Sequence, residues 1–321
     1  MTSQQMDYVL AVVQEQSFSK AAQKLYVTQP SLSQSIIAIE KALGTEIFDR
    51  SRSPIRLTAA GKIIVDTIRQ IKSLEDNMKN RISDLESSVS GTLTIGASSF
   101  RTGCLLAKSI AKFRLSYPDV EVSVIEDSSE RLLKLIKEGQ LDVFVGTGSF
   151  DKKHFHAEAL AKESLLLAVP KSHPFNEKFS DCTLSAQDIR KQSMKYLTAG
   201  AILPAELSDL SFVVTERGEF GEDRLAAVCE EGGFVPRVAM KARTLETLFS
   251  FVNEGFGAAL IPDTLIRFGN YDSHPCYYLI DSESVSENIS LVSRKNSYFS
   301  NAAAQYSLTL KNLVDIGTWR V

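Results

Sequence analysis

Residues 17–36 read SFSKAAQKLYVTQPSLSQSI, and this stretch decides the fold of the N-terminal part of the chain. Small and apolar residues at 21–25 predict a short amphipathic helix, and Tyr26-Val27 predicts a tight turn. Thr28 is a suitable N-cap for a second helix, in which Pro30 lies in the first turn, where its missing N–H removes no hydrogen bond. Two helices joined in this way predict a helix-turn-helix unit, whose second helix enters the major groove of DNA.

The sequence on either side of this stretch completes a small domain. Apolar residues at helical spacing over 6–13 predict a preceding helix. The second helix of the unit continues to Leu43, where Gly44 ends it. The following stretch 50–57 reads RSRSPIRL and predicts a two-stranded hairpin with three arginines. We interpret this hairpin as a wing, because guanidinium groups at its tip can lie on the DNA backbone or enter a narrow A·T-rich minor groove.

The side chains expected to contact DNA are small and polar on the helix and cationic on the hairpin. A glutamine can form a bidentate pair with adenine, and hydroxyls can reach bases or phosphates. The candidates are Ser19, Thr28, Gln29, Pro30, Ser31, Ser33, Gln34, Arg50, Arg52, Ser53 and Pro54, with Ser35 beside them on the same helix. The residues alone leave a second interpretation open, in which the basic hairpin is a solvated loop and the Ala-rich helix only a core element.

Positive charge is concentrated in the same region. The chain has 36 Lys+Arg against 39 Asp+Glu and a net charge of -3, which excludes a uniformly basic nucleic-acid-binding protein. Residues 18–62 nevertheless hold seven cations against three anions, whereas residues 91–321 hold 25 cations against 29 anions. This asymmetry predicts one small module that meets phosphates and one larger module with a different task.

A single long helix is expected from about 58 to 87. Its apolar residues recur at alternating steps of four and three, at Ile64, Ile68, Ile71, Met78, Ile82 and Leu85, and only Glu75 interrupts the seam. At about 45 Å, such a helix is too long to pack on the small module alone, so we expect it to pair with a second copy. The alternative is a helix that packs on its own domain. Residues 87–91 have the composition of a hinge.

Strand and helix patterns alternate from Gly91 onward. Strands are expected at 93–96, 120–125, 141–145, 165–169, 212–214, 238–240, 258–261 and 290–294, and helices at 104–116, 129–138, 223–231, 245–253 and 302–314. The expected fold is therefore an all-α-rich winged helix-turn-helix at 1–58, a linker and hinge at 59–90, and an α/β domain at 91–321. Two Rossmann-like lobes, 91–162 with 266–321 and 163–265, make a cleft between them the expected ligand site.

The ends of the expected strands supply candidate ligand-binding groups. Residues 97–102 read ASSFRT, so two hydroxyls, the Arg101 guanidinium and a helix start are available to hold a carboxylate or another anion. Further strand ends lie at 127–129, 146–148 and 216–220. The alternative is that Ser98 and Ser99 only cap a helix and that Arg101 is solvated.

Several of these stretches resemble LysR-type transcriptional regulators. Residues 17–36, with Leu43-Gly44, 47–50 (IFDR) and 57–61 (LTAAG), are similar to the winged helix-turn-helix of that family. Gln34 departs from it, because the family often has Arg there, and Thr28 stands where Ser is commoner. The larger half resembles the family's effector domain, which looks like a periplasmic binding protein. The similar residues are Phe113, Tyr117-Pro118, 139–143 (GQLDV), 169–174 (VPKSHP) and 255–262 (GFGAALIP).

The resemblance implies a regulator of transcription whose long helix forms dimers, with tetramers as the family norm and RNA polymerase as a further partner. It implies a small-molecule effector between the lobes. With Arg101 from the strand-end argument, the candidates are Ser98, Ser99, Arg101, Thr102, Ser128, Thr147 and Phe220. Residues 194–209 look like an insertion relative to the family pattern. A dimer with two reading helices predicts an imperfect palindrome as the target in double-stranded DNA.

Other classes of function find little support in the sequence. It contains no nucleophile elbow, Walker loop, HExxH or dinucleotide fingerprint, so no catalytic residue, metal or cofactor is expected. His154 and His156 form a weak pair for a metal, and Cys182 with Cys229 is a weak candidate for a redox-sensing regulator of the same family. A solute-binding protein of transport predicts an export signal and no basic head, whereas this sequence predicts a cytoplasmic protein without a membrane span. An enzyme with an unusual site is the remaining alternative.

Overall fold

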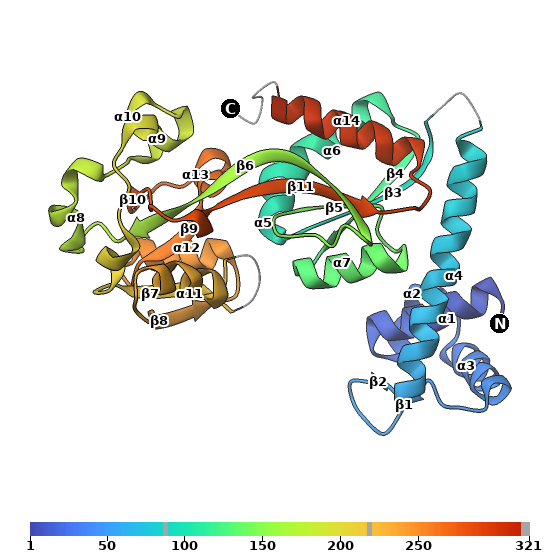
Figure 1. The fold of residues 1–321 in the computed structure, drawn as a ribbon. Helices are drawn as coiled ribbons and strands as arrows, with labels where there is room; N and C mark the ends of the chain where they lie inside the picture. Colours follow the sequence, from blue (N-terminus) through green and yellow to red (C-terminus); the bar gives the residue numbers. More distant parts are fainter. Residues whose placement is uncertain (86–88, 217–219, 316–321) are drawn as a thin grey trace. The chain divides into compact units, whose positions relative to one another are not determined.

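The computed structural model describes residues 1–85, 89–216 and 220–315 of the chain, which divides into two compact units, Met1–Met78 and Lys79–Val321 (Figure 1). The first unit, called the head below, begins with three helices and a short hairpin. Their bounds are α1 Ser3–Glu15, α2 Phe18–Lys24, α3 Gln29–Leu43, β1 Phe48–Asp49 and β2 Arg56–Leu57. The long helix α4, Ala59–Ser83, begins in the head and ends in the second unit.

Local signals explain where the head helices begin and end. The Ser17 hydroxyl accepts a hydrogen bond from the Lys20 N–H and starts α2. The Thr28 hydroxyl accepts one from the Ser31 N–H at 3.4 Å and starts α3. Gly44 ends α3 with a φ of 69°, in the left-handed region that glycine adopts without strain. The expected order of helices, turn and hairpin is therefore confirmed.

One core holds the head together. Val9, Val12, Ala21, Leu32 and Ile36 are among its fully buried residues, and α4 adds Val65 and Ile68. The start of α4 lies very close to the backbone of Ile47. A Cβ on Gly61 would stand 2.0 Å from the Ile47 carbonyl oxygen, so a side chain at position 61 would separate the two segments.

The seam of α4 divides into two parts. Ile64, Ile68 and Ile71 pack in the head core, as the alternative interpretation of this helix expects. Farther along, Met78 is 54% exposed and Ile82 58% exposed. The helix ends at Ser83, four residues before the expected end, and residues 86–88 of the expected hinge lie outside the described residues.

Asn80 in the last turn of α4 and Asp84 just after it form hydrogen bonds within the second unit. The buried Asn80 amide donates to the Thr92 carbonyl at 3.2 Å, and its oxygen accepts from the Thr92 N–H at 3.1 Å. Asp84 accepts hydrogen bonds from the Asn301 N–H at 2.9 Å and from the Tyr298 hydroxyl. The Asn80 contacts hold the last turn of the helix to β3 (Gly91–Ala97), and the Asp84 contacts hold the following turn to the start of α14 (Asn301–Asp315).

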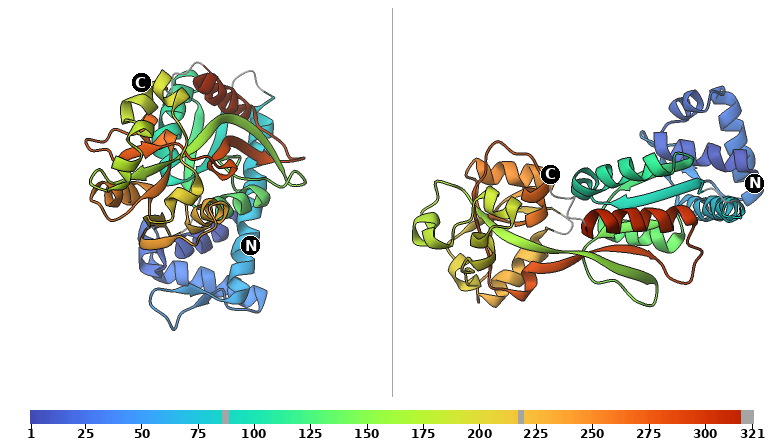
Figure 2. Two further views of the ribbon diagram at one scale, coloured as in Figure 1. Left: turned by 60° about the vertical axis from the view of Figure 1, so that its left-hand side comes forward. Right: turned by 90° about the horizontal axis from the view of Figure 1, so that it is seen from above.

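The first lobe of the second unit is a sheet covered by helices on both faces. Strands β3 Gly91–Ala97, β4 Val120–Glu126 and β5 Val143–Gly146 are parallel, and β11 Ser286–Arg294 joins β5 antiparallel. Alternate residues of β5 face different layers, because Val143 and Val145 pack with α6 and α14, whereas Phe144 packs with α7 (Figures 1 and 2). These helices are α6 Ala107–Ser116, α7 Ser129–Glu138 and α14 Asn301–Asp315.

The second lobe is built on the far half of a shared strand. The first half of β6 Phe155–Val169 pairs with β11, and its second half pairs with β9 Ala259–Pro262 and β10 Cys276–Tyr278. Two parallel strands, β7 Ser211–Thr215 and β8 Arg237–Ala242, form a second sheet. The helices of this lobe are α8 Phe175–Lys178, α9 Ala186–Lys191, α10 Met194–Thr198, α11 Glu222–Glu231, α12 Leu245–Asn253 and α13 Asp263–Phe268.

The α/β architecture of two lobes is confirmed, with three differences in detail. The sheet is mixed, because β6, β9, β10 and β11 pair antiparallel. β6 begins at Phe155, ten residues before the expected strand, since its polar first half gives no apolar run. Tyr278, Ile280 and Val285 pack in the core of the second lobe, although the expected boundaries place them in the first. Within the described residues, no helix has the length and apolarity that crossing a bilayer requires.

Candidate nucleic-acid interface and ligand pocket

The first turn of α3 presents its polar residues to solvent. Leu32, Ile36 and Ile39 are buried on the inner face of the helix, which leaves the opposite face outward. Gln34 is exposed on that opposite face, and Gln29 is exposed because it is the first residue of the helix. Thr28, Pro30 and Ser31 are also exposed, Ser33 and Ser35 are half-buried, and Ser19 of α2 is exposed. The structure thus brings together, in accessible positions, the side chains that the sequence selects on this helix.

The arginines of the hairpin differ in how they are held. Arg50 is tied to the head, because its guanidinium pairs with Glu40 at 2.8 Å and lies 5.0 Å from the centre of the Phe18 ring. Arg52 is 61% exposed and pairs with Asp49 at 3.2 Å. Ser53 and Pro54 are exposed between β1 and β2. Arg52 is therefore freer than Arg50 to move toward a phosphate.

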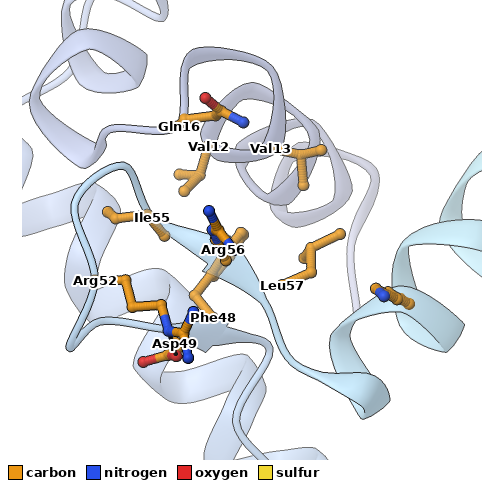
Figure 3. Close-up of a pocket in the computed structure, with 10 residues that line it drawn as sticks. Val12, Val13, Gln16, Phe48, Asp49, Arg52, Ile55, Arg56 and Leu57 are labelled. Carbon is orange, nitrogen blue, oxygen red and sulfur yellow. Dashed lines mark ion pairs between the residues drawn. The ribbon is translucent and has the colours of Figure 1, made fainter.

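A pocket of about 670 Å³ lies between the end of α1 and the hairpin (Figure 3). Its wall is apolar on the α1 side, at Val12 and Val13, and cationic at Arg52 and Arg56 of the hairpin and at Lys62 of α4. Gln16, Phe48, Asp49, Ile55 and Leu57 complete the lining. Arg56 and Lys62 form no ion pair within the described part of the chain. The sequence candidates for DNA contact include neither of these two cations.

A second pocket, of about 240 Å³, lies between the two lobes of the second unit and is called the cleft pocket below. Its first-lobe wall comes from the ends of β3 and β4, and its second-lobe wall from the end of β7 and the start of α12. The lining residues are Ser98, Ser99, Phe100, Asp127, Ser128, Thr215, Phe220, Arg243, Thr244, Leu245 and Glu246. Four of the seven predicted effector residues are among them, namely Ser98, Ser99, Ser128 and Phe220.

Helices α5 (Ser99–Arg101), α7 and α12 of the α/β unit begin at the cleft pocket. The Ser128 hydroxyl accepts a hydrogen bond from the Arg131 N–H at 3.4 Å at the start of α7. The Thr244 hydroxyl accepts one from the Thr247 N–H at 3.2 Å at the start of α12. Ser98 caps the short helix α5 in the same way. The positive ends of the α7 and α12 dipoles favour a negative group in the pocket.

Arg101 does not line the cleft pocket. Its side chain is 1% exposed and donates to both carboxylate oxygens of Glu163, at 3.2 and 2.7 Å. The Thr264 hydroxyl also donates to Glu163. The chain turns through α5 directly after Ser98, and this turn carries the guanidinium away from the pocket and toward β6. The sequence could not reveal this partner, because Glu163 lies 62 residues farther along the chain.

Thr102 and Thr147 are also outside the pocket lining. Thr102 follows α5 in a π-helical turn, Thr102–Leu106, and its buried hydroxyl has no hydrogen-bond partner among the described residues. Thr147 is 6% exposed. The arginine of the pocket is instead Arg243, at the end of β8. The expected strand 238–240 is followed by the Arg243-Thr244 pair, so its end carries the same kind of signal as the ends of the first-lobe strands.

The cleft pocket also has an apolar part and a buried hydroxyl. The rings of Phe100 and Phe220 meet edge to face with their centres 6.3 Å apart. Thr215 is 4% exposed, and its hydroxyl has no hydrogen-bond partner in the described ranges 1–85, 89–216 and 220–315. A buried hydroxyl without a partner is destabilising, and a ligand group that bonds to it removes this penalty.

The cysteines and histidines form neither a disulfide nor a metal-binding group of three among the described residues. All four cysteines are free thiols, so Cys182 and Cys229 are not bonded to each other. Burial raises the pKa of Cys104 to about 12 and that of Cys229 to about 11, which disfavours the thiolate that reacts with oxidants. His154 pairs with Asp151 at 2.6 Å. No cluster of three metal-binding side chains occurs among the residues that are described.

Two family models match the chain. The model described as "Bacterial regulatory helix-turn-helix protein, lysR family" matches residues 3–62, and "LysR substrate binding domain" matches residues 86–312. Among sequence relatives, the uncharacterized HTH-type transcriptional regulator YcgK of Bacillus subtilis (strain 168) is 28% identical over 304 residues, which cover 94% of this chain and 91% of the relative. A probable RuBisCO transcriptional regulator of Phaeodactylum tricornutum is 27% identical and covers 97% of both chains.

Solved structures share the fold. Full-length CbnR complexed with its target DNA superposes with a TM-score of 0.69 at 20% identity, covering 97% of this chain and 99% of that one. Full-length BenM superposes with a TM-score of 0.57 at 22% identity, covering 99% and 98%. The matched regions include both the head and the α/β unit.

Proposed function

Because the chain belongs to the LysR family of bacterial helix-turn-helix regulators, we propose that it reads DNA with the first turn of α3 and binds a small ligand in the cleft pocket. It acts in this proposal by binding rather than by catalysis. The observation that carries the proposal is the exposed N-terminal part of α3, where the side chains of Gln29, Ser31 and Gln34 are accessible to solvent.

Base reading and phosphate binding are assigned to different residues. Gln29 and Ser33, with Gln34, are assigned to base edges in the major groove. Arg52, Arg50, Ser53 and Pro54 of the hairpin are assigned to the backbone or the minor groove, and Ser19, Thr28, Pro30 and Ser31 to positioning. The excess of cations at residues 18–62 supports a salt-dependent affinity. The complex of the structural neighbour CbnR with its target DNA supports the same mode of action.

The exposed half of α4 supports a dimer. Met78 and Ile82 are 54% and 58% exposed, and they continue the apolar seam of α4 beyond the part that packs in the head. Leu85, two residues after the end of the helix, is 87% exposed. Burying these side chains against a second copy removes apolar surface from water. A dimer then places two α3 helices in major grooves one helical turn apart or a multiple of it, so the target is an imperfect palindrome. By resemblance to the family, we also propose that two dimers form a tetramer and that the protein contacts RNA polymerase.

The cleft pocket supports regulation by a ligand. It lies between two lobes that share β6, so a ligand that binds one arrangement of the lobes better than another shifts the equilibrium between them. Ser98, Ser99, Ser128 and Phe220 are the predicted residues assigned to this ligand. Ser99 is exposed in the pocket, which makes it a suitable position for a test.

A gel-shift titration tests DNA binding directly. The full chain is titrated against the DNA upstream of its own gene at two salt concentrations. Saturable binding that weakens steeply with salt is expected, because the cations of the head displace condensed counterions. Undetectable or salt-insensitive binding removes the proposal. For the pocket, Ser99→Ala is expected to weaken the response to an effector, and an unchanged response removes Ser99 from the site.

A further inference from the structure

Charges of both signs line the cleft pocket. Arg243 and Glu246 come from the second lobe, and Asp127 comes from the first. All three side chains are exposed, and none takes part in an ion pair within the ranges that the structure describes. The two carboxylates and the guanidinium are therefore available to form ion pairs with a ligand.

Asp127 and Glu246 are stabilised by different interactions. Asp127 accepts a hydrogen bond from the Ser128 N–H at 2.7 Å, which holds one of its oxygens and leaves the other for a donor. Glu246 lies in the first turn of α12, where the helix dipole favours a negative side chain. A ligand with only a negative charge would be repelled by both carboxylates. A ligand with only a positive charge would be repelled by Arg243 and by the positive ends of α7 and α12.

Thr215 gives an independent sign of a ligand in the same pocket. Only 4% of Thr215 is exposed, and the residue lines the pocket. Its hydroxyl has no hydrogen-bond partner among the described residues. The nearby Phe100, Phe220 and Leu245 are apolar. The pocket therefore combines both charges, one unsatisfied hydroxyl and an apolar wall.

We propose that the ligand of the cleft pocket is a small zwitterion of the α-amino acid class. Arg243 and the starts of α7 and α12 bind its carboxylate, Asp127 and Glu246 bind its ammonium group, and Phe100 and Phe220 contact its side chain. This inference rests on the proposed function, because it names the class of effector for the same pocket. The pocket volume of about 240 Å³ suits a ligand of this size.

The test compares ligands that differ only in the amino group. The full chain is mixed with each of the common α-amino acids and, separately, with the carboxylic acid of the same carbon skeleton that lacks the amino group. Binding is measured by calorimetry and by the increase in the temperature of unfolding, since a ligand that binds the folded state stabilises it. At least one amino acid is expected to bind at least about tenfold more tightly than its deaminated counterpart, because the ammonium group forms charge-assisted hydrogen bonds.

Neutralising Asp127 and Glu246 is expected to change the affinities for the amino acid and for the deaminated acid in opposite directions. Asp127→Asn combined with Glu246→Gln is expected to weaken amino acid binding by about tenfold or more, because two charges that attract the ammonium are lost. The same variant is expected to strengthen binding of the deaminated acid, because two charges that repel it are removed. Glu254→Gln, at the other end of α12 and exposed, serves as the matched control and is expected to change neither.

The outcomes separate this inference from the proposed function. If no amino acid binds, or if the deaminated acids bind as tightly as the amino acids, the zwitterion proposal is overturned. Binding of the deaminated acids alone keeps a ligand-sensing pocket and overturns only its class. Failure of the full chain to bind DNA, measured separately, affects the proposed function and not the chemistry of the pocket.

Discussion

Arg101 and Glu163 form a buried, two-fold hydrogen-bonded ion pair, with side chains 1% and 3% exposed. Arg101 belongs to α5, which begins at the cleft pocket, and Glu163 lies on β6, the strand that both lobes share. The Thr264 hydroxyl of α13 donates to the same carboxylate. One ion pair therefore joins the wall of the pocket to the strand about which the lobes are arranged.

Removing one partner of this pair is expected to be costly. Arg101→Met leaves the Glu163 carboxylate buried without its cation, and the free energy of unfolding is expected to fall by about 3–5 kcal/mol. The double variant with Glu163→Met is expected to recover most of the loss, because no buried charge remains. Urea unfolding of the full chain measures both. Glu158→Gln, which removes a surface pair with Lys311, is expected to cost only about 0–1 kcal/mol. Equal losses in the single and double variants would contradict a charge effect.

Asp263 predicts a dependence of stability on pH. Burial raises the pKa of this carboxyl to about 6, the positive charge of Arg267 opposes the rise, and the negative charge of Glu163 adds to it. The folded state therefore holds the proton more tightly than the unfolded chain. The resulting stabilisation is complete below about pH 4 and is lost as the pH rises through about 6.

The comparison with Asp263→Asn isolates this contribution. The free energy of unfolding of the natural chain, minus that of the variant, is expected to grow by about 1 kcal/mol as the pH falls from 8 to 5. Urea titrations at several pH values provide the measurement. A difference that stays constant, or that grows as the pH rises, would contradict the assigned direction.

The contact between Asn80 and Thr92 predicts the effect of a third change. Asn80→Ala removes two hydrogen bonds to the backbone at a buried site, so it is expected to destabilise the α/β unit by about 1–3 kcal/mol. Asn77→Ala is the matched control on the same helix, because Asn77 is half-buried and its side chain bonds, among the described residues, only to Ser73, at 3.5 Å. Both changes raise helix propensity equally, so the difference between them reports the Thr92 contact. Equal midpoints of thermal unfolding would show that the contact contributes nothing.

The sequence predicts the head well because its signals are local. Thr28, Pro30 and Gly44 act within a few residues of their own positions, so the bounds of α3 follow from the chain around them. The apolar strands of the α/β unit are predicted for the same reason. The polar half of β6 is not, because its partners on β11 lie more than a hundred residues away.

The cleft pocket is predicted only in part. Ser98 and Ser128 are found because each begins a helix directly after a strand. Arg101 has the same sequence signal, yet its conformation is decided by Glu163, a partner that only the fold brings near. Thr215 gives no signal at all, since its significance lies in a hydroxyl that the surrounding residues bury.

Arg52 predicts a change in the salt dependence of DNA binding. It is 61% exposed on the hairpin, and its loss as a phosphate contact is expected to reduce the slope of log affinity against log salt by about one. Fluorescence anisotropy of Arg52→Ala with a labelled duplex at several salt concentrations measures the slope. Lys191→Ala removes an exposed cation from the α/β unit and is expected to leave the slope unchanged. The same slope for Arg52→Ala and the natural chain would remove Arg52 from the interface.

Gln29→Ala shows whether the first turn of α3 discriminates between base pairs. A duplex selected from a random pool by the natural chain is compared with a scrambled duplex of the same length, and Gln4→Ala on α1 is the control. Gln29→Ala is expected to weaken binding to the selected duplex by about 1–3 kcal/mol and to leave binding to the scrambled duplex unchanged. Equal affinity of Gln29→Ala and the natural chain for the selected duplex would contradict base reading by this turn.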